Sequence, residues 1–260
     1  RSFRVVRMAG RGGVNLGRAP SLYSIQRTSS IAALVIVAAA AWWFLLASEA
    51  AMTRMAGDGP IMDLMWLMMT PVDTVPYLLA ASTMWIAMMI AMMIPAAVPM
   101  ALIYRRMDRG ASSNLDTFIF SCGYLAGWSF YSLGAAGLQW WLHSRGTLHG
   151  HLLVTGANLA AAILIAAGVY QLTPLKEACL NRCRSPLGFF VENWKEGRLG
   201  AFKMGLHHGL FCVGCCWVLM LLMFAGGAMS VATMAALSIF ILAERLLPAG
   251  PWVSRVPGLM

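Results

Sequence analysis

Five of the six cysteines in this 260-residue chain lie in two short groups, and thiols grouped in this way bind soft metal ions. Cys179 and Cys183 are four residues apart, while Cys212 and Cys215 form a Cys-x-x-Cys motif that Cys216 directly follows. Two cysteine pairs on separate segments are the usual arrangement of a tetrahedral thiolate site. The spacing therefore predicts that one metal ion is bound between the two groups.

Neighbouring residues could extend this ligand set. His208 lies one turn before Cys212 and could supply an imidazole, and Cys216 is equally a spare ligand or a packing residue. Free cysteine is also a common buried residue that needs no metal, and we favour that interpretation for the isolated Cys122. Three further histidines fall in one loop, where solvated side chains are favoured over a weak metal site. They are His143, His149 and His151.

Methionines supply a second set of soft donors. Met88 and Met92 belong to an i, i+4 stripe that Pro95 and Pro99 follow, and these prolines would free backbone carbonyls. Thioethers suit Cu(I), but polarizable methionine also fills irregular helix interfaces, and a stripe alone favours packing. Beside a thiolate cluster we interpret it as a conduit for the metal. The stripe consists of Met84, Met88 and Met92, with Met89 and Met93 beside it.

The composition excludes a water-soluble enzyme. Hydrophobic residues make up 60% of the chain and charged residues only 11%, whereas a soluble domain carries about a quarter charged residues. We expect an all-α membrane protein, because helices satisfy their own backbone groups within lipid. The net charge of +9 indicates membrane orientation and contact with anionic lipids, and nothing indicates nucleic-acid binding.

Charged residues divide the chain into a bundle of about six transmembrane helices, since a span needs about 20 apolar residues. We expect a basic cytoplasmic tail at 1–27 and a single membrane domain at 28–260. Thr173-Pro174 should end the fourth span and begin a short helix, and Gly226-Gly227 should separate the last two spans. The expected spans lie near 28–48, 74–104, 117–142, 152–173, 205–225 and 228–243, with interfacial helices near 61–72 and 184–203.

The distribution of basic residues predicts the orientation. With the N-terminus in the cytoplasm, all but two of the 19 Lys and Arg residues fall on the cytoplasmic side, the exceptions being Arg54 and Arg145. Cytoplasmic segments of membrane proteins carry this excess of positive charge. We therefore expect both termini in the cytoplasm, a multi-pass protein of the bacterial inner membrane, and a sulfur layer near its cytoplasmic face.

The chain resembles a bacterial family of uncharacterised, predicted metal-binding integral membrane proteins. The segments that carry the resemblance are WIAMMIAMMIPAAVPM at 85–100, YQLTPLKEACLNRCRSP at 170–186 and HGLFCVGCCWVLM at 208–220, with Glu244 following. The resemblance implies the six-span fold and makes the five grouped cysteines family features, but it supplies no substrate. Arg245 stands where we expect a lysine, a departure from which we expect little consequence.

Three functions fit these observations. The first is binding and handling of a soft metal, with Cu(I) favoured, which would pass between the methionine stripe and the thiolates and on to a metal chaperone or other membrane subunits. The second is a structural Zn²⁺ site in an accessory subunit of a larger membrane complex. The third, ranked lowest, is a membrane dithiol oxidoreductase that uses Cys212 and Cys215, because a reducing cytoplasm favours metal-bound thiolates. No catalytic motif is visible, so an enzyme is not favoured.

Overall fold

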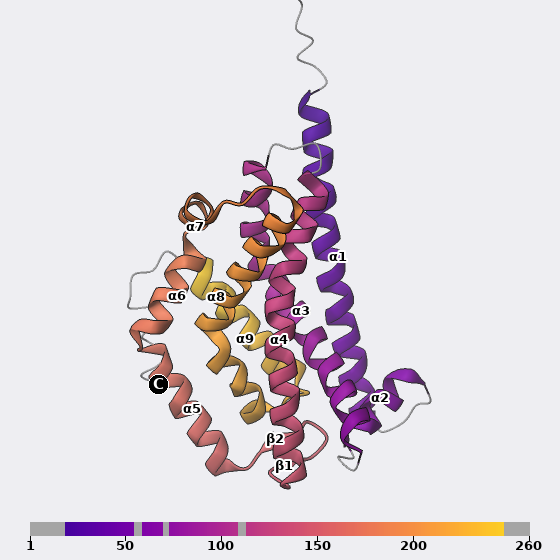
Figure 1. Ribbon diagram of the computed structural model, residues 1–260. Helices are drawn as coiled ribbons and strands as arrows, with labels where there is room; N and C mark the ends of the chain where they lie inside the picture. The colour runs from indigo at the N-terminus through magenta and orange to yellow at the C-terminus, as the bar shows by residue number, and fades with distance from the viewer. Residues whose placement is uncertain (1–18, 55–58, 70–72, 109–112, 247–260) are drawn as a thin grey trace, which may run out of the picture.

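The computed structural model describes residues 19–54, 59–69, 73–108 and 113–246, and these form an all-α bundle (Figure 1). One two-stranded antiparallel hairpin interrupts the helices, which the sequence analysis did not anticipate. The elements are α1 (Ala19–Arg54), α2 (Pro60–Met69), α3 (Thr74–Met107), α4 (Ser113–Ser144), β1 (Leu148–His149), β2 (Val154–Thr155), α5 (Ala157–Gln171), α6 (Pro174–Arg184), α7 (Pro186–Asn193), α8 (Gly197–Gly226) and α9 (Val231–Leu246).

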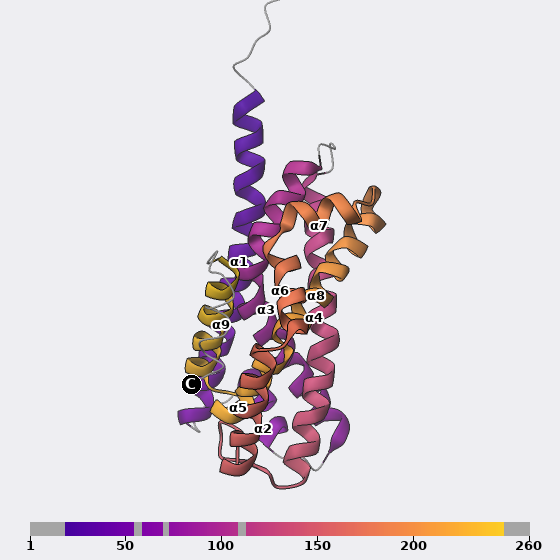
Figure 2. The ribbon, with the colours of Figure 1, turned by 90° about the vertical axis from the view of Figure 1, so that its left-hand side faces the viewer.

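The long helices lie side by side and run alternately up and down the bundle (Figure 1). The central layer is α3, α4 and α8, and α1 packs on α3 while α5 and α6 pack on α8. After a quarter turn, α9 is seen beside α1 at the left of the bundle, where it packs on α3 and α8 (Figure 2). We call the end that carries α7 the α7 end, and the end that carries α2 and the hairpin the α2 end.

Glycines allow α4 and α8 to approach closely. Gly123 and Gly127 on α4 face Gly205 and Gly209 on α8, and each pair has the four-residue spacing of a small-residue packing face. A Cβ at Gly205 would collide with the backbone carbonyl of Phe120, and one at Gly123 with that of Phe202. This contact brings the middle of α4 against the stretch of α8 that carries the cysteines.

The prolines in α3 free backbone acceptors, as the sequence predicts. Proline has no N–H, so Pro95 leaves the carbonyl of Ala91 without its helical partner. The indole N–H of Trp42 on α1 donates to that carbonyl at 3.0 Å. Farther along, the hydroxyl of Ser238 on α9 donates to the carbonyl of Met92 at 3.4 Å. The Trp42 indole therefore satisfies the acceptor that Pro95 frees, and Ser238 adds a contact from α9 to the same part of α3.

Two predicted helix boundaries are confirmed. The Thr173 side chain accepts a hydrogen bond from the backbone N–H of Lys176 and Pro174 opens α6, so α5 ends and α6 turns away from it by 65°. At the other break, α8 ends at Gly226 and Gly227 adopts φ = +101°, a conformation that favours glycine. The bend at Thr173 sets the angle at which the cysteines of α6 approach α8.

Other boundaries differ from the expected spans. α1 begins at Ala19 and α8 at Gly197, both before the predicted starts near 28 and 205. The predicted interfacial helices correspond to α2 and α7, although the expected positions 70–72 lie outside the described residues. Within the described residues, three helices are long and apolar enough to cross a membrane, or four if α5 and α6 form one broken span.

A buried ion pair fixes α6 against α9. The Lys176 ammonium donates to the Glu244 carboxylate at 2.6 Å, and the two side chains are 1% and 4% exposed. The Arg184 side chain also donates to the backbone carbonyl of Glu244. Because burying a charge without its partner is costly, this pairing holds the two helices in one register. It also places the residue after Glu244 beside the cysteines.

Candidate metal centre

Helices α6 and α8 bring the two cysteine groups together. The side chains of Cys183 and Cys215 lie near enough to interact, so the two groups are neighbours. Cys179 lies against Gly214, where a Cβ would stand only 3.1 Å from the Cys179 sulfur. Glycine at this position therefore lets the Cys179 thiol approach α8. The predicted pairing of the two segments agrees with this geometry.

The three cysteines of α8 are deeply buried. Cys212, Cys215 and Cys216 are at most 2% exposed, while Cys179 and Cys183 are partly exposed. The thiols of Cys215 and Cys216 both donate to the backbone carbonyl of Cys212, at 3.1 and 3.0 Å. Because α8 begins at Gly197, Cys212 lies halfway along the helix and deeper than a site at the start of a span would lie.

Arg245 reaches into the cysteine cluster from α9. Its Nη2 donates to the sulfur of Cys212 and lies 3.6 Å from the sulfur of Cys215. The other terminal nitrogen lies 3.5 Å from the carbonyl of Ala96, in the proline-broken part of α3. A buried guanidinium stabilises negative charge on the sulfurs that it contacts. The charge of Arg245 lies directly beside the cysteine cluster, a position that the sequence analysis did not anticipate.

His208 lies next to the cluster with an unused imidazole. The ring is 1% exposed, and neither nitrogen has a hydrogen-bond partner among the described residues. Tyr124 of α4 stacks on this ring with centroids 5.6 Å apart, and its hydroxyl lies 3.0 Å from the sulfur of Cys212. A buried imidazole without a partner is costly, so it is available as a ligand one turn from Cys212.

The methionine stripe of α3 ends beside the cysteine cluster of α8. Met88 and Met92 are at most 1% exposed and belong to the same buried cluster as the cysteines of α8. The Tyr124 hydroxyl joins the two regions, since it also donates to the carbonyl of Met93 at 3.4 Å. The stripe therefore runs along the inside of α3 and reaches the level of Cys212, in an arrangement that suits either packing or a conduit.

Three of the other candidate residues lie apart from this cluster, namely Cys122, His143 and His149. No hydrogen bond joins Cys122 to another cysteine within the described residues, in keeping with its interpretation as a packing residue. The Nδ1 of His143 is 3.0 Å from the hydroxyl of Tyr77, in a buried chain that includes Gln139. His149 lies at a separate surface hollow beside the hairpin.

The candidate ligand atoms are not arranged around a single metal position. Within the described residues, no three or more Cys, His, Asp or Glu side chains are arranged as they stand to hold a metal ion. The thiols instead bond to Tyr124 and to the carbonyl of Cys212. Metal binding would therefore require thiol side chains to rotate away from these hydrogen bonds as they lose their protons.

Sequence reasoning missed Tyr124 and Arg245 as parts of this site. Two signals could have found them. The paired four-residue glycine spacings at 123–127 and 205–209 place α4 on α8, which brings Tyr124 to Cys212. A charged residue near the end of an apolar helix is a functional candidate in a membrane protein, and Arg245 is such a residue.

Comparison with known proteins gives one match. A family model described as PpoB2, copper chaperone, matches residues 82–260, which is about two thirds of the chain and includes every candidate ligand above. No curated protein and no solved structure matches the chain. The match confirms that this is a metal-handling family and describes it as a copper chaperone, in place of the uncharacterised family named from the motifs. α1 and α2 lie before the matched region.

Proposed function

The chain belongs to the copper chaperone family PpoB2, and on that basis we propose that it is an integral membrane protein that binds and passes on Cu(I). Its thiolate centre is formed by Cys212 and Cys215, with Cys179, Cys183, Cys216 and His208 as further donors. Met88 and Met92 line the route by which the ion reaches or leaves this centre. Soft thiolates and thioethers together are the donors that Cu(I) prefers.

The observation that carries this proposal is the contact of Arg245 with the thiols of Cys212 and Cys215. Cu(I) bound by two thiolates has a net charge of −1, which one guanidinium balances. Zn²⁺ bound by four thiolates would have a charge of −2 and would keep one charge uncompensated. Lys176 cannot supply that charge, because Glu244 already pairs with it. Uncompensated charge is costly in a buried site, so a single guanidinium suits Cu(I) with two thiolates better than Zn²⁺ with four.

The methionine stripe gives a test that separates a conduit from packing. Replacing Met88 and Met92 with leucine keeps volume and hydrophobicity, and such exchanges cost less than about 1.5 kcal/mol per site. Leucine has no lone pair to offer to copper. We expect the double variant to fold and to keep its Cu(I) affinity at the thiolates, but to transfer copper more slowly in reconstituted vesicles.

The matched control for this experiment is Met100→Leu. Met100 lies on the same helix and is 3% exposed, but it packs in a separate cluster near the α7 end. Copper transfer should be unchanged in this variant. Equal transfer rates in the Met88→Leu/Met92→Leu variant and the parent protein would assign the stripe to packing.

We also propose six membrane spans with both termini in the cytoplasm. The alternating helix directions and the location of nearly all basic residues on one side support this topology (Figure 1). A reporter that is active only in the cytoplasm should be active when fused after Arg255 and inactive when inserted at Gly150. An inactive C-terminal fusion or an active insertion at Gly150 would contradict the topology.

A further inference from the structure

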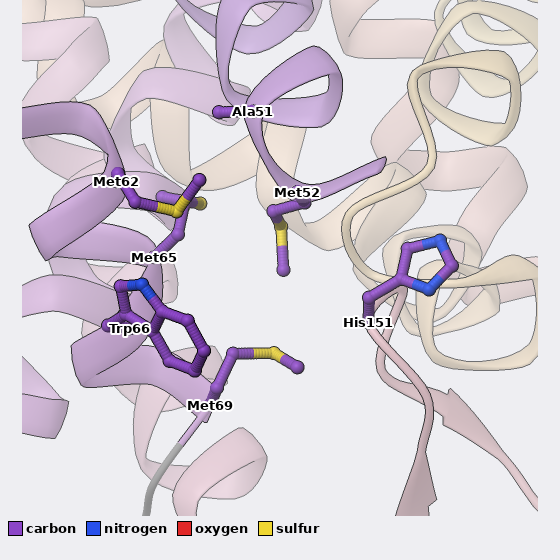
Figure 3. Close-up of a pocket in the computed structure, with 7 residues that line it drawn as sticks. All are labelled: Ala51, Met52, Met62, Met65, Trp66, Met69 and His151. Carbon is purple, nitrogen blue, oxygen red and sulfur yellow. The ribbon is translucent and has the colours of Figure 1, made fainter. Parts of the chain in front are cut away.

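A second set of soft donors lies at the α2 end, far along the bundle from α7. Ala51 and Met52 at the end of α1, one face of α2 and the loop between β1 and β2 enclose a small cavity (Figure 3). The sulfur donors are Met52, Met62, Met65 and Met69, and the nitrogen donor is His151.

The spacing on α2 explains why three thioethers share this cavity. Met62, Met65 and Met69 are spaced i, i+3 and i+7, which places them on one face of a helix. Met52 and Met65 are 4% and 1% exposed, so two of the four thioethers are buried. Figure 3 shows the thioethers of Met52 and Met69 extending into the space that His151 borders on the other side.

The imidazole of His151 is available to a ligand. Neither ring nitrogen is hydrogen-bonded to any of the residues that the structure describes. In this it differs from His143, whose Nδ1 lies 3.0 Å from the Tyr77 hydroxyl. The sequence analysis treated the loop histidines as one solvated group, but the fold separates them and places His151 opposite the methionines.

The size of the cavity restricts what it can hold. Its volume is about 20 Å³. One water molecule needs about 10–15 Å³, so this space has room for a single small ion. The described side chains that line it include no carboxylate, which disfavours hard divalent cations. Neutral thioethers and an imidazole instead suit a soft monovalent ion.

We propose that Met52, Met62, Met65, Met69 and His151 form a second Cu(I) site at the α2 end. The inference rests on the proposed copper function and extends it to α1 and α2, which lie outside the region that the family model matches. Neutral donors hold Cu(I) less tightly than thiolates do. Copper therefore exchanges readily at this second site. The higher affinity of the thiolate centre favours transfer of the ion toward Cys212.

The buried core connects the two sites. Met52 and Met65 belong to the same continuous cluster as Met88, Met92 and the cysteines of α8. A single buried core therefore extends from the cavity at the α2 end to the thiolate centre.

Anaerobic titration of the full chain with Cu(I), in competition with a chromogenic chelator, tests the second site. We expect two bound equivalents of different affinity. Met52→Leu/Met69→Leu should lose the weaker equivalent and keep the tighter one, and retention of the tighter one shows that the variant is folded. His151→Ala, a loop substitution, should weaken the same equivalent. The matched control is Met68→Leu on α2, which is fully buried but does not line the cavity and should keep both.

The outcomes distinguish this inference from the proposed function. If Met52→Leu/Met69→Leu and His151→Ala both bind Cu(I) with the stoichiometry and affinities of the parent protein, the second site does not exist. If Cys212→Ser/Cys215→Ser instead keeps the tighter equivalent, the proposed thiolate centre fails. Loss of only the weaker equivalent in the methionine variant supports the second site in either case.

Discussion

Cys212→Ser/Cys215→Ser is expected to abolish tight Cu(I) binding. Serine hydroxyls are hard, neutral donors at physiological pH and cannot replace soft thiolates. The two sulfurs are also those that Arg245 contacts, so the variant loses both the ligands and the anionic charge that the guanidinium balances. Loss of an outer-shell partner typically costs about 10–100-fold in metal affinity, and loss of two ligands should exceed this. Chelator competition on the purified protein measures the change.

Cys122→Ser provides the matched control for that variant. Cys122 is a partly exposed thiol on α4 with no hydrogen bond to the other cysteines of the described structure, and its removal should leave Cu(I) affinity unchanged. Both variants should elute as the parent protein does in size-exclusion chromatography. If Cys212→Ser/Cys215→Ser still binds Cu(I) tightly, the copper centre does not lie on α8.

Arg245→Met is expected to weaken Cu(I) binding while the metal-free protein still folds. Without copper the thiols can stay protonated, so loss of the guanidinium leaves no buried anion. With copper bound, the two thiolates lose their compensating charge. Truncating one partner of a buried, hydrogen-bonded charge pair costs about 2 kcal/mol or more, which corresponds to about a 30-fold loss of affinity. The same chelator competition measures this loss.

Two further variants separate charge from side-chain packing at this position. Arg245→Lys keeps the positive charge and should retain most of the affinity, although lysine cannot donate to two sulfurs in the fixed geometry of a guanidinium. Arg182→Met removes an arginine that lies on α6 but is half-exposed and pairs with Glu192 at the surface. Its Cu(I) affinity should match that of the parent protein. Equal affinities for Arg245→Met and Arg245→Lys would contradict a role for the charge.

The sequence predicts much of this fold because local signals set its boundaries. Thr173 and Pro174 mark the bend between α5 and α6, and Gly227 marks the turn before α9. Both act through backbone chemistry that depends only on neighbouring residues. The pairing of the two cysteine groups also follows from spacing, although the sequence does not show that the thiols bond to Tyr124 and to a backbone carbonyl.

Contacts between distant helices could not be derived in the same way. Lys176 meets Glu244 and Arg245 meets Cys212 only because α6, α8 and α9 all pack against one another, and no local pattern specifies that arrangement. The separation of His151 from His143 likewise depends on the unexpected hairpin between α4 and α5. Contacts between residues that are far apart in the sequence are therefore visible only once the helices are packed.

X-ray absorption at the copper edge tests the central claim most directly. The protein is loaded with one equivalent of Cu(I), which the tighter centre should take. We predict the edge of a monovalent ion and a nearest shell composed of sulfur, both lost in Cys212→Ser/Cys215→Ser. A nearest shell of oxygen or nitrogen without sulfur, or the same sulfur shell in that double variant, would contradict a thiolate copper centre on α8.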